Sequence, residues 1–171
     1  WYHPCVHSIE QGIKKEEYLY PRDKNDINAQ YTMADAVFTA CFLNMCNRNC
    51  DIVGMANFAP IVNTRGCIYT HEKGIVLRST YYVFDLYVNY LGDQILDSWT
   101  EDVPVKNMSV AKETESVKQA DVLVTSFSNG SGYAVAAVNK QAEEELELVL
   151  ELKTEGQVIL HYISGESTEA Y

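Results

Sequence analysis

The sequence predicts an α/β segment followed by an all-β segment, and two patterns lead to this fold class. Before Gly92, two stretches of helical apolar spacing flank one short, largely apolar stretch, which is the order of elements in a parallel barrel or an open parallel sheet. After Gly92, short strand patterns alternate with turn residues, as in an antiparallel β-sandwich or jelly roll. We therefore predict two domains, residues 1–93 and 94–171.

The charge distribution changes at the same place. Residues 1–93 hold ten acidic and eight basic side chains, whereas residues 94–171 hold fourteen and five. The net charge of -11 argues against binding to nucleic acid or to an anionic membrane, because both need a basic face. With 47% hydrophobic residues the chain can bury a core, and it has no run of about 18 apolar residues that would predict a membrane helix.

The first segment opens with an irregular stretch that leads into a helix. Residues 3–30 are polar and carry prolines and a glycine, so we predict a long loop, and loops of this length in compact domains are often functional. Thr32 is a suitable N-cap for a helix over residues 33–46. Alanines are frequent in this stretch and its apolar side chains follow helical spacing.

The remainder of the first segment predicts a strand, a loop and a second helix. Residues 51–57 are short and largely apolar, which is typical of a strand buried on both faces of a parallel sheet. Residues 58–66 would leave that strand as a loop, and residues 74–77 are compatible with a short strand. Residues 79–91 show helical spacing again, and Gly92 stands where a C′ glycine would end the helix.

The second segment predicts six short strands separated by turn signals such as Asn129-Gly130. Residues 145–152 alternate between leucine or valine and glutamate, as expected for an antiparallel strand with one buried face. The six predicted strands are residues 94–99, 105–110, 122–128, 133–139, 145–152 and 157–163.

The cysteines do not predict a metal site. There are five, all within the first 67 residues, and no C-x2-C pair occurs among them. His3, Cys5 and His7 lie close together in the sequence, but their spacing matches no known zinc site, so we expect neither a metal nor another cofactor. We interpret the cysteines as reduced, mostly buried thiols of an intracellular protein.

Several stretches of the chain carry the motifs of a known enzyme family. Residues 56–63 read Ala-Asn-Phe-Ala-Pro-Ile-Val-Asn, residues 80–87 read Thr-Tyr-Tyr-Val-Phe-Asp-Leu-Tyr, and the chain opens with Trp1-Tyr2. The first two resemble the end of the catalytic barrel in α-L-arabinofuranosidases of glycoside hydrolase family 51. The opening matches the end of that family's Asp-Glu-Trp-Asn-Val-Trp-Tyr motif, and residues 161–165 are similar to the last strand of its C-terminal β-sandwich.

The resemblance implies the end of a (β/α)8 TIM barrel over residues 1–93, followed by a jelly-roll-like antiparallel β-sandwich. Family members are retaining glycosidases, which hold two carboxyl groups roughly 5 to 5.5 Å apart, one as nucleophile and one as acid/base. In the family the nucleophile is the Glu of the opening motif, upstream of Trp1, and the acid/base Glu lies earlier still. We therefore assign no catalytic residue to this chain and expect the isolated chain to be inactive.

The resemblance assigns four positions to the wall of the sugar pocket: Trp1, Asn57, Pro60 and Asn63. Trp1 matches the second Trp of the motif, and an indole face suits sugar C–H groups. Asn57 to Asn63 would follow the last barrel strand at its carboxyl end, where barrel active sites lie. Some family members carry a Gln at the position of Pro60 that contacts substrate, and Pro60 cannot donate such a hydrogen bond. Loop asparagines such as Asn57 and Asn63 also serve as turn formers.

The resemblance implies a complete protein that removes terminal α-L-arabinofuranosyl residues from hemicellulose oligosaccharides, without a cofactor. We expect a cytoplasmic homo-oligomer, as is common in the family. One alternative is a non-catalytic carbohydrate-binding or structural β-sandwich, which would need exposed aromatic side chains on one sandwich face. Another is a different barrel glycosidase with the same layout, against which the linked motifs of residues 57–63 and 80–87 argue.

Overall fold

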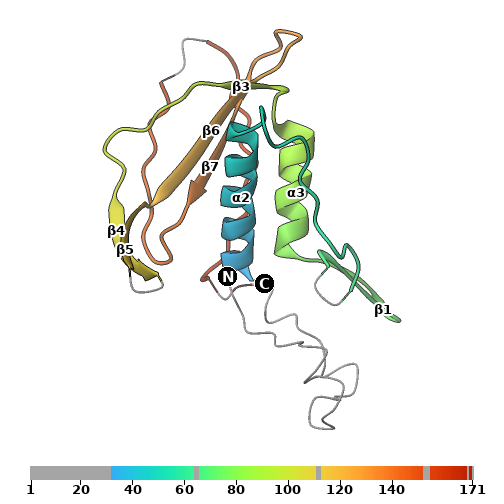
Figure 1. Ribbon diagram of the computed structural model, residues 1–171. Coiled ribbons are helices and arrows are strands. Elements are labelled where there is room, and N and C mark those ends of the chain that lie inside the picture. Colours follow the sequence, from blue (N-terminus) through green and yellow to red (C-terminus); the bar gives the residue numbers. More distant parts are fainter. Residues whose placement is uncertain (1–31, 64–65, 111–112, 152–154, 169, 171) are drawn as a thin grey trace.

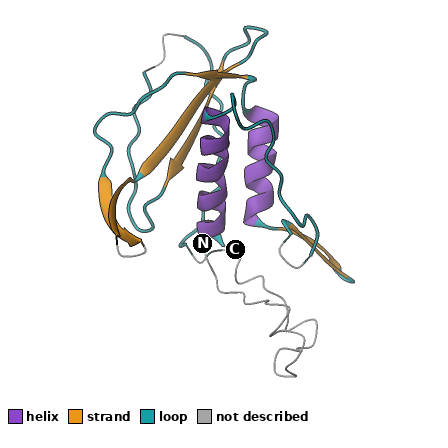
Figure 2. Cartoon of the chain, viewed as in Figure 1, coloured by secondary structure: helices purple, strands orange, loops and turns teal. Residues whose placement is uncertain are grey.

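The computed structural model describes residues 32–63, 66–110, 113–151, 155–168 and 170. Two helices, α2 and α3, lie side by side and run in the same direction, and a three-stranded sheet lies against α2 (Figure 1). Two separate hairpins extend from this body, one near the beginning of the helices and one beyond the sheet (Figure 2). No helix among these residues is long and apolar enough to cross a membrane.

Helix α2 spans Met33–Arg48 and confirms the first predicted helix, with Thr32 as its N-cap. Asp35 in the first turn accepts a hydrogen bond from the Thr32 backbone N–H at 3.0 Å, and Arg48 in the last turn complements the helix dipole. The small side chains of Ala36 and Ala40 are buried, which lets α3 approach closely.

The predicted strand over residues 51–57 is not a strand in the structure. After α2 the chain runs back alongside the helices in an extended conformation, but residues 53–58 form no ladder. Ile52 and Met55 are 79% and 76% exposed, not buried. The prediction was wrong because a parallel strand needs a neighbour on at least one edge, and the described residues supply none here.

A hairpin and helix α3 complete the first segment. Strands β1 (Ile68–His71) and β2 (Gly74–Leu77) pair antiparallel, so the short strand expected at residues 74–77 is confirmed and its partner is additional. Helix α3 spans Ser79–Tyr90, as predicted to within one residue. Gly92 follows the C-cap, as predicted. The structure shows a close approach as the reason for glycine here, because a Cβ would collide with the Ser126 carbonyl group.

The second segment contains two separate antiparallel sheets. The larger has the order β3-β6-β7, formed by β3 (Gln94–Leu96), β6 (Ala120–Ser126) and β7 (Tyr133–Asn139). The smaller is the hairpin of β4 (Val105–Val110) and β5 (Glu113–Lys118). The predicted strands over residues 105–110 and 133–139 are confirmed with the same bounds, and those over residues 94–99 and 122–128 are confirmed with shifted ends. Strand β5 was not predicted, because its sequence, ETESVK, is polar on both faces.

The last two predicted strands are absent from the described residues. Residues 145–151 and 157–163 form no ladder. Leu148, Leu150 and Val149 are all exposed, by 36%, 48% and 75%. The two leucines are therefore less exposed than the valine between them, which is the direction that the alternating pattern predicts. An alternating pattern states which face of a strand would be buried, but it does not supply the neighbouring strand whose hydrogen bonds make it one.

One core connects the two segments. Its fully buried members come from the two helices, and it is completed by side chains from the sheet and from the C-terminal residues. The members are Ala36, Ala40, Leu43 and Val83, with Met33, Phe84, Tyr87, Val138 and Ile163 packed against them. The predicted boundary between residues 93 and 94 therefore separates stretches that share a core, because Val138 and Ile163 pack against the helices.

Candidate functional site

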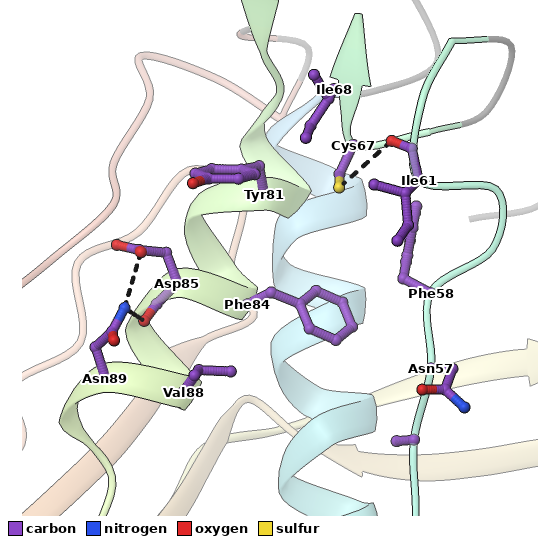
Figure 3. Close-up of a pocket in the computed structure, with 11 residues that line it drawn as sticks. Asn57, Phe58, Ile61, Cys67, Ile68, Tyr81, Phe84, Asp85, Val88 and Asn89 are labelled. Atoms are coloured by element: carbon purple, nitrogen blue, oxygen red, sulfur yellow. Dashed lines mark hydrogen bonds between the residues drawn. The ribbon is translucent and has the colours of Figure 1, made fainter.

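An open groove of about 400 Å³ lies between the extended segment after α2 and one side of α3 (Figure 3). Most of its lining is apolar. Its polar side chains come from α3, except for Asn57 on the extended segment. The lining residues are Ala56, Asn57, Phe58, Ile61, Cys67, Ile68, Tyr81, Phe84, Asp85, Val88 and Asn89.

Aromatic packing joins the two sides of the groove. The Phe58 and Phe84 rings meet edge to face with centroids 5.7 Å apart, which ties the extended segment to α3. The Cys67 thiol donates to the Ile61 carbonyl oxygen at 3.7 Å, and burial raises the pKa of this thiol. Cys67 therefore acts as a small apolar packing group and not as a nucleophile.

The polar side of the groove carries a single carboxylate. Asn89 Nδ2 donates to the Asp85 carbonyl oxygen at 3.0 Å and to Asp85 Oδ1 at 2.9 Å (Figure 3). Asp85 is the only acidic side chain among the lining residues. A retaining glycosidase needs two carboxyl groups about 5 Å apart, so the groove residues cannot perform that chemistry by themselves.

Of the three predicted sugar-wall positions that the structure describes, one, Asn57, lines the groove. Asn57 is exposed and lines it, whereas Pro60 lies in the exposed turn beyond it, after a cis Ala59-Pro60 bond. Trp1 lies outside the described residues. The structure therefore places Asn57 and Pro60 on the same loop without joining them in one pocket.

Asn63 has a structural function in the turn before β1. Its φ of 56° is left-handed, a conformation that asparagine tolerates better than most residues. Its Oδ1 accepts hydrogen bonds from the Thr70 N–H at 2.7 Å and from the Thr70 hydroxyl at 3.0 Å. The carbonyl oxygen of the Asn63 side chain is thus used to join the loop to the hairpin.

A buried polar cluster between α2, α3 and β6 was not predicted from the sequence. Asn44 is 0% exposed; its Nδ2 donates to Asp121 Oδ1 at 3.0 Å, and its Oδ1 accepts from the Tyr87 hydroxyl at 2.6 Å. Arg48 forms an ion pair with Asp121 and donates to the Val122 carbonyl oxygen at 2.8 Å. The sequence signal for this cluster was Asn44, a polar residue among the apolar residues of the predicted helix. The helical spacing alone does not show which residue binds it.

Two weak acids next to this cluster are held in their neutral forms. Burial, with a smaller contribution from the Asp121 charge, raises the pKa of the Cys41 thiol to about 11. Burial also raises the pKa of Tyr87 well above its usual range, and its hydroxyl donates to Asn44 Oδ1. The cluster is therefore suited to joining elements and not to proton transfer.

Comparison with known proteins identifies the family to which this chain belongs. Residues 1–170 match the family described as the α-L-arabinofuranosidase C-terminal domain. The chain is 30% identical over 142 residues to a probable α-L-arabinofuranosidase C of Aspergillus fumigatus, with 82% of this chain and 28% of the relative covered. It is 30% identical over 131 residues to an intracellular exo-α-L-arabinofuranosidase of Bacteroides ovatus, covering 75% of this chain and 24% of the relative.

Solved structures agree with this assignment. An α-L-arabinofuranosidase of Thermotoga maritima, solved with arabinose, superposes with a TM-score of 0.60 at 28% identity, over 68% of this chain and 25% of that one. A family 51 α-L-arabinofuranosidase of Thermotoga petrophila gives 0.56 at 28% identity, over 67% and 25%. The chain belongs to the α-L-arabinofuranosidase C-terminal domain family. It spans about 28% of the length of its Aspergillus fumigatus relative.

Proposed function

We propose that this chain is the C-terminal part of a retaining α-L-arabinofuranosidase, which removes terminal arabinofuranosyl residues from hemicellulose oligosaccharides. The observation that carries the proposal is the family match over residues 1–170, together with relatives named for this activity. In such an enzyme one carboxylate forms a covalent glycosyl intermediate and a second carboxyl group acts as acid and base. We propose that both lie in a part of the protein that precedes these residues.

The open groove supports this proposal. Two parallel helices joined through an extended segment would form the last part of a barrel in the complete protein, where the extended segment would become the final strand. That strand would gain a neighbour on its open edge, and the neighbouring unit would cover the groove. Val88 lines the groove and is 76% exposed, as expected for a side chain whose partner belongs to another part of the protein.

The sugar wall is proposed for the loop of residues 57–63, part of which lines the groove. In a barrel, residues after the carboxyl end of the final strand face the active site, and Asn57, Pro60 and Asn63 occupy such a loop here. We propose that the side-chain amide of Asn57 contacts the sugar, that Pro60 packs against it, and that Asn63 holds the loop in place through Thr70. Trp1 is proposed as the aromatic face of the same wall.

We further propose a cytoplasmic homo-oligomer. The name of the Bacteroides ovatus relative supports an intracellular location.

The test is hydrolysis of 4-nitrophenyl α-L-arabinofuranoside by this chain and by a longer chain in which a family barrel precedes it. We expect activity in the longer chain alone. Val88→Asp should leave the unfolding midpoint of the isolated chain unchanged and abolish activity of the longer one. Val105→Asp, on the exposed hairpin β4–β5, is the matched control and should affect neither. Activity of the isolated chain, or inactivity of a folded longer chain, would contradict the proposal.

A non-catalytic carbohydrate-binding module is the second candidate, and one observation favours it. Trp99 lies after β3 and is 81% exposed, with its indole N–H donating to Glu101 Oε1 at 3.3 Å. An exposed indole suits stacking on a sugar ring. Binding of arabino-oligosaccharides to the isolated chain, lost in Trp99→Ala, would favour this candidate over the enzymatic one.

A further inference from the structure

The beginning of α2 is capped by residues from the far end of the chain. The first N–H groups of a helix have no partner within the helix. Here the Met33 N–H donates to the Ala170 carbonyl oxygen at 2.8 Å, and the Ala34 N–H donates to the Thr168 carbonyl oxygen at 3.1 Å. The next two N–H groups, of Asp35 and Ala36, donate to the Thr32 carbonyl oxygen. Half of the helix cap is therefore supplied by residues more than 130 positions away.

This capped end is buried together with the beginning of α3. Thr32, Asp35 and Ser79 are all buried, although each is polar. The Ser79 hydroxyl donates to the Thr32 carbonyl oxygen at 2.9 Å, so the beginnings of the two helices are joined directly. Buried polar groups of this kind are stable only while their hydrogen bonds are made, so removing the C-terminal carbonyl groups would expose or orphan the α2 donors.

The C-terminal residues fit this place closely. A Cβ at Gly165 would lie 2.5 Å from Met33 Cγ and 2.8 Å from Ala170 Cβ, so any larger residue would force Met33 or Ala170 to shift. Further back, Ile163 packs into the helical core, and the His161 ring stacks on Tyr90 with centroids 3.9 Å apart. The segment thus contacts the helices through rings, through the core and through backbone hydrogen bonds.

We propose that residues 161–168 together with Ala170, termed the clasp, position the beginning of α2 and, through the Ser79–Thr32 hydrogen bond, the beginning of α3. The clasp acts at the end of the helices where the loop of residues 59–63 also lies (Figure 1). If the proposed function holds, this is the face of the sugar pocket. The clasp then acts on the loop of residues 59–63 indirectly, because Ser79 joins the beginning of α2 to α3 and the Arg78 N–H donates to the Cys67 carbonyl oxygen at 2.9 Å. The residues of the clasp are positioning residues, because none needs to touch the substrate.

The test is hydrogen exchange of backbone amides in the 171-residue chain, comparing Gly165→Ala with the matched control Gly156→Ala, where an added Cβ meets nothing within 4 Å. We expect exchange at Met33 and Ala34 to rise on the order of ten-fold in Gly165→Ala, with Leu43 in the same helix unchanged. A chain ending after Glu166 should behave like Gly165→Ala. Unchanged exchange at Met33 and Ala34, or an equal rise along the whole of α2, would overturn the proposal.

An activity measurement in the longer chain separates this inference from the proposed function. Gly165→Ala should raise KM at least several-fold with a smaller change in kcat, and shortening the clashing side chain in Gly165→Ala/Met33→Ala should restore part of the loss. If exchange changes as expected but the longer chain has no activity with or without the substitution, the clasp stands and the proposed function fails. If activity is present and KM is unchanged, positioning of the pocket is refuted.

Discussion

The two sides of helix α3 differ in how complete they are. Towards α2, the core, the Asn44–Asp121 cluster and the clasp bury apolar groups and give polar groups hydrogen-bond partners. Towards the extended segment, Val88 in the groove and Met55 on the extended segment itself are more than three-quarters exposed. The first side needs only this chain, whereas the second has the composition of an interface. The exposed apolar side chains on the groove side of α3 therefore support the proposal that another part of the protein packs there, in addition to the sequence motifs.

The largest effect should come from breaking the complete side at Asp121. Asp121→Ala removes the partner of Asn44 Nδ2, which is fully buried, and of Arg48. We expect a loss of about 2 to 3 kcal/mol in the free energy of unfolding, mostly from the orphaned Asn44, because the Arg48 side chain is 40% exposed and its ion pair is screened. Urea unfolding measures it. The exposed Asp97→Ala is the control, and equal losses in both variants would contradict the assignment.

A smaller effect is expected at the loop beside the groove. Asn63→Ala should cost about 2 kcal/mol, because alanine resists a left-handed backbone and both bonds from Thr70 are lost. Asn63→Gly keeps the backbone conformation and should cost only about 1 kcal/mol. Thermal unfolding of the two variants compares them. Equal losses would mean that the left-handed conformation contributes nothing, and no loss in either would remove the structural function of Asn63.

The pH dependence of stability should reveal the burial of Cys41. Its pKa is raised from 9.0 to about 11 in the folded chain, so the folded state holds this proton more tightly than the unfolded state. The resulting stability is complete below pH 9 and is lost as the pH rises towards about 11. Cys41→Ala should flatten the stability curve in this interval, measured by urea unfolding at each pH. A curve that is identical with and without the thiol would contradict the burial of Cys41.

The smallest effect separates two buried threonines. Thr80 is 2% exposed, and its hydroxyl oxygen finds no partner among the described residues, whereas the Thr125 hydroxyl accepts from the Gly92 N–H at 2.8 Å. Thr80→Val should therefore be neutral or stabilising by up to about 1 kcal/mol, and Thr125→Val should destabilise by about 1 kcal/mol. Melting temperatures of the pair test this, and a destabilising Thr80→Val would indicate a partner for that hydroxyl.

Local patterns were sufficient for elements whose partners lie near in the sequence. Both helices and the strands β4 and β7 follow from spacing, because a helix makes its own hydrogen bonds and β7 follows β6 after a glycine-containing turn. The strands expected at residues 51–57, 145–152 and 157–163 failed for one common reason. Their patterns describe a buried face, but a strand exists only beside a neighbour, and no neighbour pairs with these residues in the described structure.

Some features of the candidate site could likewise be predicted from the sequence, and others could not. The sequence identified the family motif, which includes the loop of residues 56–63. It did not indicate that Asn63 would bind Thr70, that Asn44 would find Asp121, or that residues 168 and 170 would cap α2. By itself, then, the sequence determined the helices, the turns and the family, which depend on residues close together in the chain. Only the tertiary structure decided which distant polar groups meet, because a hydrogen-bond partner is chosen by position in space and not by distance along the chain.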